Sequence, residues 1–252
     1  MKRLLLLLLC LLGSRVANCQ DDEAANQKTI LNFINCVKNK KIELIANKIT
    51  FPFLREYPLP EIHNKTEFYN RYNEIFDDTL LKHIINSNSK TDWTVMGWRG
   101  MMLFNGELWL DFDGRLRNIS YQSKIEAQKR AQLIKEEKNT LHPSIRKYLC
   151  PLHIIETVKY RIRIDDLGKD NFRYCAWTIN KPMSAAPDLV ITNGKYIFDG
   201  SGGNHSYKFE NKNFTYDVYI RVMGEENEAP ATLTISKDNI IIQISQATIL
   251  RK

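Results

Sequence analysis

The sequence predicts a two-domain α+β protein, and three observations support this. Apolar residues recur at helical spacing from about Lys28 onward. Two hairpin signals, Asn105-Gly106 and Asp113-Gly114, then separate short apolar runs. From Leu141 to the end, short strand-like segments alternate with turn residues. We therefore expect N-terminal helices on a curved antiparallel sheet, followed by a small β-sandwich or barrel.

The first nineteen residues have the pattern of a secretory signal. Lys2 and Arg3 precede an apolar run over Leu4–Leu12, and Gly13 and Ser14 interrupt the run. Nine apolar residues are too few for a helix that spans a bilayer. Residues 1–19 are therefore interpreted as a signal peptide that is removed from the mature chain.

The end of this segment resembles a bacterial lipoprotein signal. In Val16-Ala17-Asn18-Cys19 a short motif precedes a cysteine, although Asn18 stands where a smaller residue is usual. The resemblance implies lipidation of Cys19, with residues 20–27 as a tether. Plain cleavage between Ala17 and Gln20 is the alternative. The mature protein is then periplasmic or on the cell surface, held to the membrane by lipid alone, or secreted if it is not lipidated.

The charge balance narrows the classes of partner. The formal net charge is +7, and loss of Lys2, Arg3 and Arg15 with the leader lowers it to about +4. The densest basic segment, Lys124–Lys138, mixes lysine and arginine with glutamate, which is typical of a solvated helix face. Proteins that bind nucleic acid usually carry a clustered basic stripe. The sequence therefore predicts no nucleic-acid partner, while an anionic ligand is compatible with it.

The cysteines outside the leader predict no metal site. Cys36 lies within an apolar helical pattern and is interpreted as a small buried hydrophobe. Cys150 and Cys175 share the second half of the chain and form a candidate disulfide in an oxidising compartment. There is no Cys-x-x-Cys pair and no Cys/His spacing typical of metal ligands. We expect neither a metal nor a cofactor.

The first domain, residues 28–138, is predicted to begin with helices. One face of the first helix is apolar, at Ile30, Leu31, Phe33, Ile34 and Val37. A second short helix is expected over Ile42–Ile49, before Pro52 ends the helical pattern. A third is expected from Asn64 to about Ile84. Three strands should follow, about Thr94–Phe104, Glu107–Phe112 and Arg115–Ser120, and then a charged helix over Lys124–Lys138.

This order resembles the NTF2-like (cystatin-like) superfamily. The likeness rests on Ile30–Phe53, Asn64–Ile85 and the stretch WTVMGWRGMMLFNGELWL. It implies a cone-shaped domain in which helices cap a strongly bent sheet and enclose a pocket. The same stretch also resembles secreted bacterial proteins and lipoproteins that share W-x-V-x-G-W-R-G followed by N-G-x-x-W. That second resemblance implies no activity.

The second domain, residues 139–252, is predicted to be all β. A short helix or turn is expected near His142–Tyr148. Strands are then expected at Val158–Ile164, Phe172–Thr178, Asp188–Thr192, Tyr196–Phe198, Ser206–Glu210, Thr215–Val222, Thr232–Ile235 and Ile240–Ile244. Short strands at near-regular spacing are typical of a small sandwich or barrel.

The glycine-rich stretch Gly200-Ser201-Gly202-Gly203 invites comparison with a phosphate-binding loop. Such a loop precedes a helix and carries a Walker lysine or the G-x-G-x-x-G spacing. Here the following residues alternate polar and aromatic, as in a strand. We therefore expect a turn between two strands. Its glycines permit close approach of a partner, and the polar side chains nearby, Asp199, Asn204, His205 and Tyr207, are the candidate partner loop.

A second set of candidates comes from the predicted sheet. Trp93, Trp98, Arg99, Glu107 and Trp109 fall on or beside its first two strands. If the sheet forms a cone, Arg99 and Glu107 would lie in its pocket, where buried charges need a partner. In the alternative interpretation, the tryptophans are core and Arg99 forms a structural ion pair. No residue spacing identifies a catalytic set.

The function that these observations favour is an exported, lipid-anchored, non-catalytic protein that binds a small molecule or an extracytoplasmic protein. One alternative is an isomerase- or hydrolase-type enzyme that uses the cone pocket. Another is an inhibitor or immunity-type protein. NTF2-like domains often pair through their sheets, so a homodimer is also compatible with the resemblance.

Overall fold

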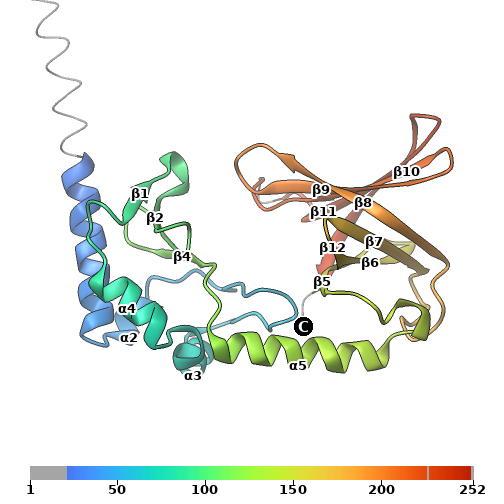
Figure 1. Cartoon of the computed structure of the whole chain (residues 1–252). Helices are drawn as coiled ribbons and strands as arrows, with labels where there is room; N and C mark the ends of the chain where they lie inside the picture. Colours follow the sequence, from blue (N-terminus) through green and yellow to red (C-terminus); the bar gives the residue numbers. More distant parts are fainter. Residues whose placement is uncertain (1–21, 226, 251–252) are drawn as a thin grey trace, which may run out of the picture. The chain divides into compact units, whose positions relative to one another are not determined.

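The computed structural model describes residues 22–225 and 227–250. They form two compact units (Figure 1). The first unit holds the described residues up to Arg55 together with Glu61–Ala127. The second holds Glu56–Pro60 and the described residues from Gln128 onward. The predicted signal peptide and the lipidation candidate Cys19 lie outside the described residues.

The helices of the first unit begin earlier than expected. Residues 22–38 are α-helical (blue in Figure 1), and α2 (Ile42–Ala46) follows after a turn at Lys40, where φ is +52°. Residues 22–27 were predicted to belong to a tether, but they are part of the first helix. Ala24, Ala25 and Gln27 are strong helix formers, which accounts for the difference.

The next helical pattern is divided in two. The structure has α3 (Lys65–Ile75) and α4 (Asp78–Asn86) where the apolar stripe predicted one continuous helix. Asn64 caps α3, because its side chain accepts a hydrogen bond of 2.9 Å from the Glu67 N–H. Asp77 caps α4 by accepting from two backbone N–H groups of the first turn. A second capping residue inside the stripe starts a new helix.

The sheet of the first unit is antiparallel, with strand order β1-β2-β3-β4. Its strands are β1 (Trp93–Val95), β2 (Met101–Leu103), β3 (Leu108–Leu110) and β4 (Leu116–Ile119). Both predicted turns, at Asn105-Gly106 and at Asp113-Gly114, lie in connections between strands. One apolar core joins the helices to this sheet, and its fully buried members include Phe68, Ile75, Leu80, Ile84, Met101 and Leu108.

The first predicted strand, Thr94–Phe104, is interrupted by a short 3-10 helix, η1 (Gly97–Arg99). Gly97 and Gly100 have φ values of +58° and +91°. These conformations lie outside the β region and are accessible to glycine at little cost. The glycines therefore divide the predicted strand into β1 and β2.

The second unit is a closed eight-stranded antiparallel barrel, in the order β10-β11-β12-β5-β6-β7-β8-β9. The strands are β5 (Cys150–Glu156), β6 (Tyr160–Gly168), β7 (Asn171–Thr178), β8 (Leu189–Asp199), β9 (Asn204–Asn211), β10 (Phe214–Ile220), β11 (Ala231–Lys237) and β12 (Ile240–Leu250). Of the sandwich and the barrel that the sequence allowed, the structure confirms the barrel. The two predicted strands between Asp188 and Phe198 are a single strand, β8. The expected short helix is η2 (Pro143–Ile145).

Helix α5 (Lys124–Thr140) packs on the outside of the barrel over β6 and β7. Side chains of β7 alternate, so that Tyr174 enters the barrel core while Cys175 and Trp177 face the outside. The boundary between the two units falls inside α5, after Ala127. No helix among residues 22–225 and 227–250 is long and apolar enough to cross a membrane.

Candidate functional site

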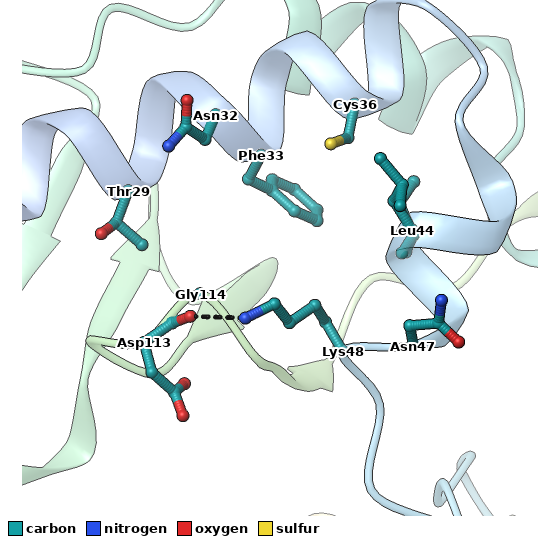
Figure 2. A pocket seen from close by; sticks show the side chains of 10 residues that line it. Thr29, Asn32, Phe33, Cys36, Leu44, Asn47, Lys48, Asp113 and Gly114 are labelled. Carbon is teal, nitrogen blue, oxygen red and sulfur yellow. Dashed lines mark hydrogen bonds between the residues drawn. The ribbon is translucent and has the colours of Figure 1, made fainter.

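A pocket of about 290 Å³ opens in the first unit (Figure 2). Three segments line it: one face of helix 22–38, the end of α2 with the residues that follow it, and the turn between β3 and β4. The lining residues are Thr29, Asn32, Phe33, Cys36, Leu44, Ile45, Asn47, Lys48, Asp113 and Gly114.

The helical wall follows from sequence spacing. Thr29, Asn32, Phe33 and Cys36 stand at i, i+3, i+4 and i+7, which places them on one face of an α-helix. Phe33 is buried and Cys36 half-buried, while Asn32 is exposed at the rim. The wall therefore changes from apolar at its base to polar at its edge.

Hydrogen bonds hold the turn between β3 and β4 against this wall. The Lys48 ammonium donates to the Asp113 carbonyl oxygen over 3.0 Å, which is the dashed line in Figure 2. The Thr29 hydroxyl donates to the Phe112 carbonyl over 3.3 Å. The Leu116 N–H donates to the Lys48 carbonyl over 2.9 Å. These three hydrogen bonds join the segments that line the pocket.

Gly114 allows the turn to approach the helix. Its φ is +81°, and a Cβ atom there would lie 3.3 Å from the Thr29 methyl group. A larger residue would be strained in its backbone and would crowd the pocket wall.

The charged groups at the rim leave a positive balance. The Asp113 carboxylate accepts from Arg115 Nε over 2.8 Å, so its charge is compensated outside the pocket. The Asn47 side-chain oxygen accepts from the Lys65 ammonium. Lys48 uses one donor on the Asp113 carbonyl, and an ammonium has three. A small molecule with an apolar body and an anionic group fits these contacts.

The five residues predicted for a cone pocket do not line this one. Trp93 is buried, and its indole N–H donates to the Ser87 hydroxyl over 2.9 Å. Trp98 is 55% exposed on η1. The Arg99 guanidinium lies 5.9 Å from the ring centre of Trp109. The structure thus brings Arg99 and Trp109 together and places Trp93 and Trp98 apart from each other, one buried and one exposed.

Glu107, the fifth of these residues, pairs with a histidine that the sequence did not single out. Its carboxylate lies 2.8 Å from His83 Nδ1, and the two side chains are partly exposed. The His83 ring also contacts Phe104 and Tyr121 edge to face. The interrupted strand accounts for the different arrangement, because η1 removes the alternation on which the cone-pocket prediction depended.

Gly200–Gly203 form the predicted turn between β8 and β9, and the four candidate partner residues lie on the two strands that this turn connects. The Asn204 side chain joins it to the next loop by accepting from the Val222 and Met223 N–H groups, each over 2.8 Å. The Asp199 carboxylate accepts from the Tyr219 hydroxyl over 2.8 Å. These polar groups form hydrogen bonds that stabilise the turn and its neighbouring segments.

The other two loop candidates face the barrel interior. His205 and Tyr207 are buried, and the His205 ring stacks on Tyr196 at 4.8 Å. His205 Nδ1 lies 2.8 Å from the Gly203 carbonyl. Phe198, next to the turn, is 78% accessible.

The structure does not contain the candidate disulfide between Cys150 and Cys175, because both residues are free thiols. Cys150 is on β5 and Cys175 on β7, with β6 between them. Two strand spacings amount to about 9–10 Å, beyond the roughly 7 Å limit for a disulfide. Burial raises the pKa of the Cys175 thiol to about 12. Cys36 lies at the pocket, half-buried.

The described residues hold no cluster of three or more His, Cys, Asp or Glu side chains that could bind a metal ion. No protein-family model matches the chain, and no curated protein and no solved structure matches it. The functional argument therefore rests on the geometry of the pocket.

Proposed function

We propose that this chain is an exported binding protein whose first unit holds a small amphipathic anion. The observation that carries the proposal is the pocket in Figure 2, which combines an apolar wall with an ammonium group at its rim. Its volume of about 290 Å³ is just below the range of roughly 300–1,000 Å³ for drug-sized ligands, which suits a smaller molecule.

The apolar wall would supply most of the binding free energy. Phe33, Leu44 and Ile45 offer hydrocarbon surface, and each methylene of a ligand covered there contributes about 0.8 kcal/mol. Because hydrogen bonds between protein groups join the three segments, binding should cost little ordering of the protein.

The polar rim would fix the orientation of the ligand. The Lys48 ammonium can donate to a carboxylate or sulfonate, and a hydrogen bond between charged groups is stronger than a neutral one. Asn47 adds a neutral donor next to Lys48, and Asn32 adds one on the helix across the pocket (Figure 2). The proposed ligand class is therefore a short hydrocarbon with one terminal anionic group.

Titration calorimetry with octanoate tests this proposal on the chain from Gln20 to Lys252, which keeps every described residue. Leu44→Glu places a carboxylate at the pocket and should weaken binding at least about tenfold. Leu31→Glu is the matched control, because Leu31 is a similarly exposed leucine outside the pocket lining. Absence of binding by the unaltered chain, or equal weakening by both variants, would exclude the pocket as the site.

The finer architecture of the first unit is also a proposal. The order of helices before an antiparallel sheet, joined by one core, supports an NTF2-like relationship. The strands are only three or four residues long, and helices and a turn line the pocket. This proposal requires the concave side of the sheet to superpose on an NTF2-like cone.

Export with a lipid anchor completes the proposed function, and its support is the sequence of residues 1–19. Metabolic labelling with an alkyne-bearing fatty acid in a bacterial host would detect the anchor. The parent chain should carry the label and Cys19→Ser should not, while Cys36→Ser should keep it. If Cys19→Ser keeps the label, the lipid is attached to a different residue. If the parent chain is shortened but carries no label, the leader is cleaved without lipidation.

A further inference from the structure

Strand β12 leaves most of one edge without a partner strand. Its residues Ile240–Ala247 pair with β11. On the other edge, β12 pairs with β5 through Thr248–Leu250. Among the described residues, no strand pairs with that second edge over Ile240–Gln246. Its backbone N–H and C=O groups can therefore form a ladder with another strand.

This free edge carries an unusual amount of exposed hydrocarbon. Ile240, Ile241, Ile242 and Ile244 are 70%, 58%, 56% and 63% accessible. The register of β12 on β11 shifts between Ile235 and Ser236. Ile241 is therefore opposite Ser236 and Ile244 opposite Thr234, which puts both isoleucines on one face of the sheet.

The edge also lacks the residues that normally prevent strand association. No charged residue and no proline occurs from Asn239 to Leu250. The chain offers an internal comparison in β8, whose residues Lys195–Asp199 pair with β9 on one edge. The charged residues Lys195 and Asp199 stand at the two ends of that segment. Charged side chains are a usual protection of a strand edge that has no partner. The free edge of β12, by contrast, is suited to a partner.

We propose that the partner is a second copy of this chain, which pairs its own β12 antiparallel across a two-fold axis. In such a pair the same surface meets itself, so a charge near the two-fold axis would face the same charge on the other copy. The uncharged edge avoids this repulsion. Isoleucine on each copy meets isoleucine on the other, and the two barrel sheets become continuous through β12.

The area that this pairing would bury fits a weak, reversible dimer. A covered isoleucine side chain removes on the order of 100 Å² from water. The eight isoleucines of two copies would bury on the order of 800 Å², and the paired backbones would add to this, which approaches the roughly 1,000 Å² of a specific interface.

Sedimentation velocity of the chain from Gln20 to Lys252, across a range of concentrations, tests the proposal. The unaltered chain should form a dimer. Ile244→Lys puts a charge on each side of the two-fold axis and should raise the dimer dissociation constant at least about tenfold. Val190→Lys is the matched control, because Val190 is an exposed apolar residue of a different strand, β8, that takes no part in the proposed pairing. It should leave the constant unchanged.

A second measurement locates the contact. It also tests the proposal independently if Ile244→Lys fails to fold. Ile242→Cys should be cross-linked to a dimer by a short bis-maleimide, well above the background of the parent chain and of Val190→Cys. A parent that stays monomeric at every concentration would overturn the proposal. So would a dimer that persists in Ile244→Lys, equal loss in Val190→Lys, or open-ended aggregation in place of a dimer.

Discussion

Arg163 and Glu137 form a two-pronged ion pair inside the second unit. Arg163 Nη1 donates to Glu137 Oε1 over 2.9 Å, and Nη2 donates to Oε2 over 3.0 Å. Both residues are buried, and Tyr57 and Tyr148 donate their hydroxyls to the same carboxylate over 3.2 Å and 3.0 Å. The pair therefore joins α5, β6 and the segment Glu56–Pro60.

Removing one partner of this pair should destabilise the barrel strongly. Arg163→Met leaves the Glu137 carboxylate buried without its counter-charge, which costs about 3–5 kcal/mol. Hydrogen exchange of amides in β6 and β7 measures the opening free energy of the barrel itself. Lys181→Met removes an exposed ion pair with Asp188 in the same unit and should change this free energy far less. Comparable effects of the two substitutions would contradict the structural role of the pair.

The same carboxylate should make the barrel sensitive to acid. Burial alone would raise the pKa of Glu137, but the hydrogen bonds and charge of Arg163, with the two tyrosine hydroxyls, hold it below the ordinary value. A lowered folded-state pKa stabilises the protein above the unfolded-state pKa, and this contribution is lost as pH falls through the folded-state pKa.

Burial raises the pKa of nearby Asp165, which opposes the trend, so a variant is needed to isolate Glu137. Glu137→Gln should reduce the loss of unfolding free energy between about pH 7 and about pH 3. Denaturant unfolding at both pH values measures the difference. A loss equal to that of the parent would show that Glu137 does not carry the acid response.

Two tyrosine-to-phenylalanine substitutions should have opposite effects on stability. The buried Tyr72 hydroxyl has no hydrogen-bond partner among the described residues, and burial raises its pKa to about 12. Tyr72→Phe should therefore stabilise the first unit by about 1 kcal/mol. Tyr57→Phe removes a hydrogen bond to Glu137 and should destabilise the second unit by about 1–3 kcal/mol. Local hydrogen exchange distinguishes the two, and a destabilising Tyr72→Phe would indicate an undetected partner for that hydroxyl.

The free cysteines lead to a simple chemical prediction. Alkylation of the oxidised, denatured chain from Gln20 to Lys252 should modify Cys36, Cys150 and Cys175, because all three are free. In the native protein Cys175 should react slowest, since it is fully buried with its pKa raised to about 12. Intact-mass spectrometry counts the added groups. A single modified thiol would point to the Cys150–Cys175 bond that the structure does not contain.

Local sequence signals predicted most of the secondary structure. Asn64 was recognised as a helix start, and it caps α3. No strand was predicted over β5, which contains Pro151, a residue that has no N–H and is uncommon inside a sheet. In the structure Pro151 lies opposite Asp165, beside a register shift that accommodates it. Closure of the barrel depends on pairing of Thr248–Leu250 with β5, and no local pattern in the sequence encodes that contact.

The candidate pocket could not be found from the sequence. Its wall, from Thr29 to Cys36, has the spacing of any amphipathic helix. Lys48 and the Asp113 carbonyl meet although they are 65 positions apart. The tryptophans led to the prediction of a site on the sheet instead. There Gly97, with a positive φ, interrupts the predicted strand. Composition identifies residues capable of binding, whereas the fold decides which of them share a cavity.

A ligand series tests the proposed binding function most directly. Straight-chain carboxylates of increasing length, each compared with the alcohol of the same length, are titrated into the parent chain and into Lys48→Met. The account predicts that affinity rises about fourfold per methylene until the pocket is full and then levels off. It also predicts that the acid binds more tightly than the alcohol, and that this preference disappears in Lys48→Met. Affinity that rises without limit, or an acid preference that survives in Lys48→Met, would contradict a site built from the pocket and its lysine.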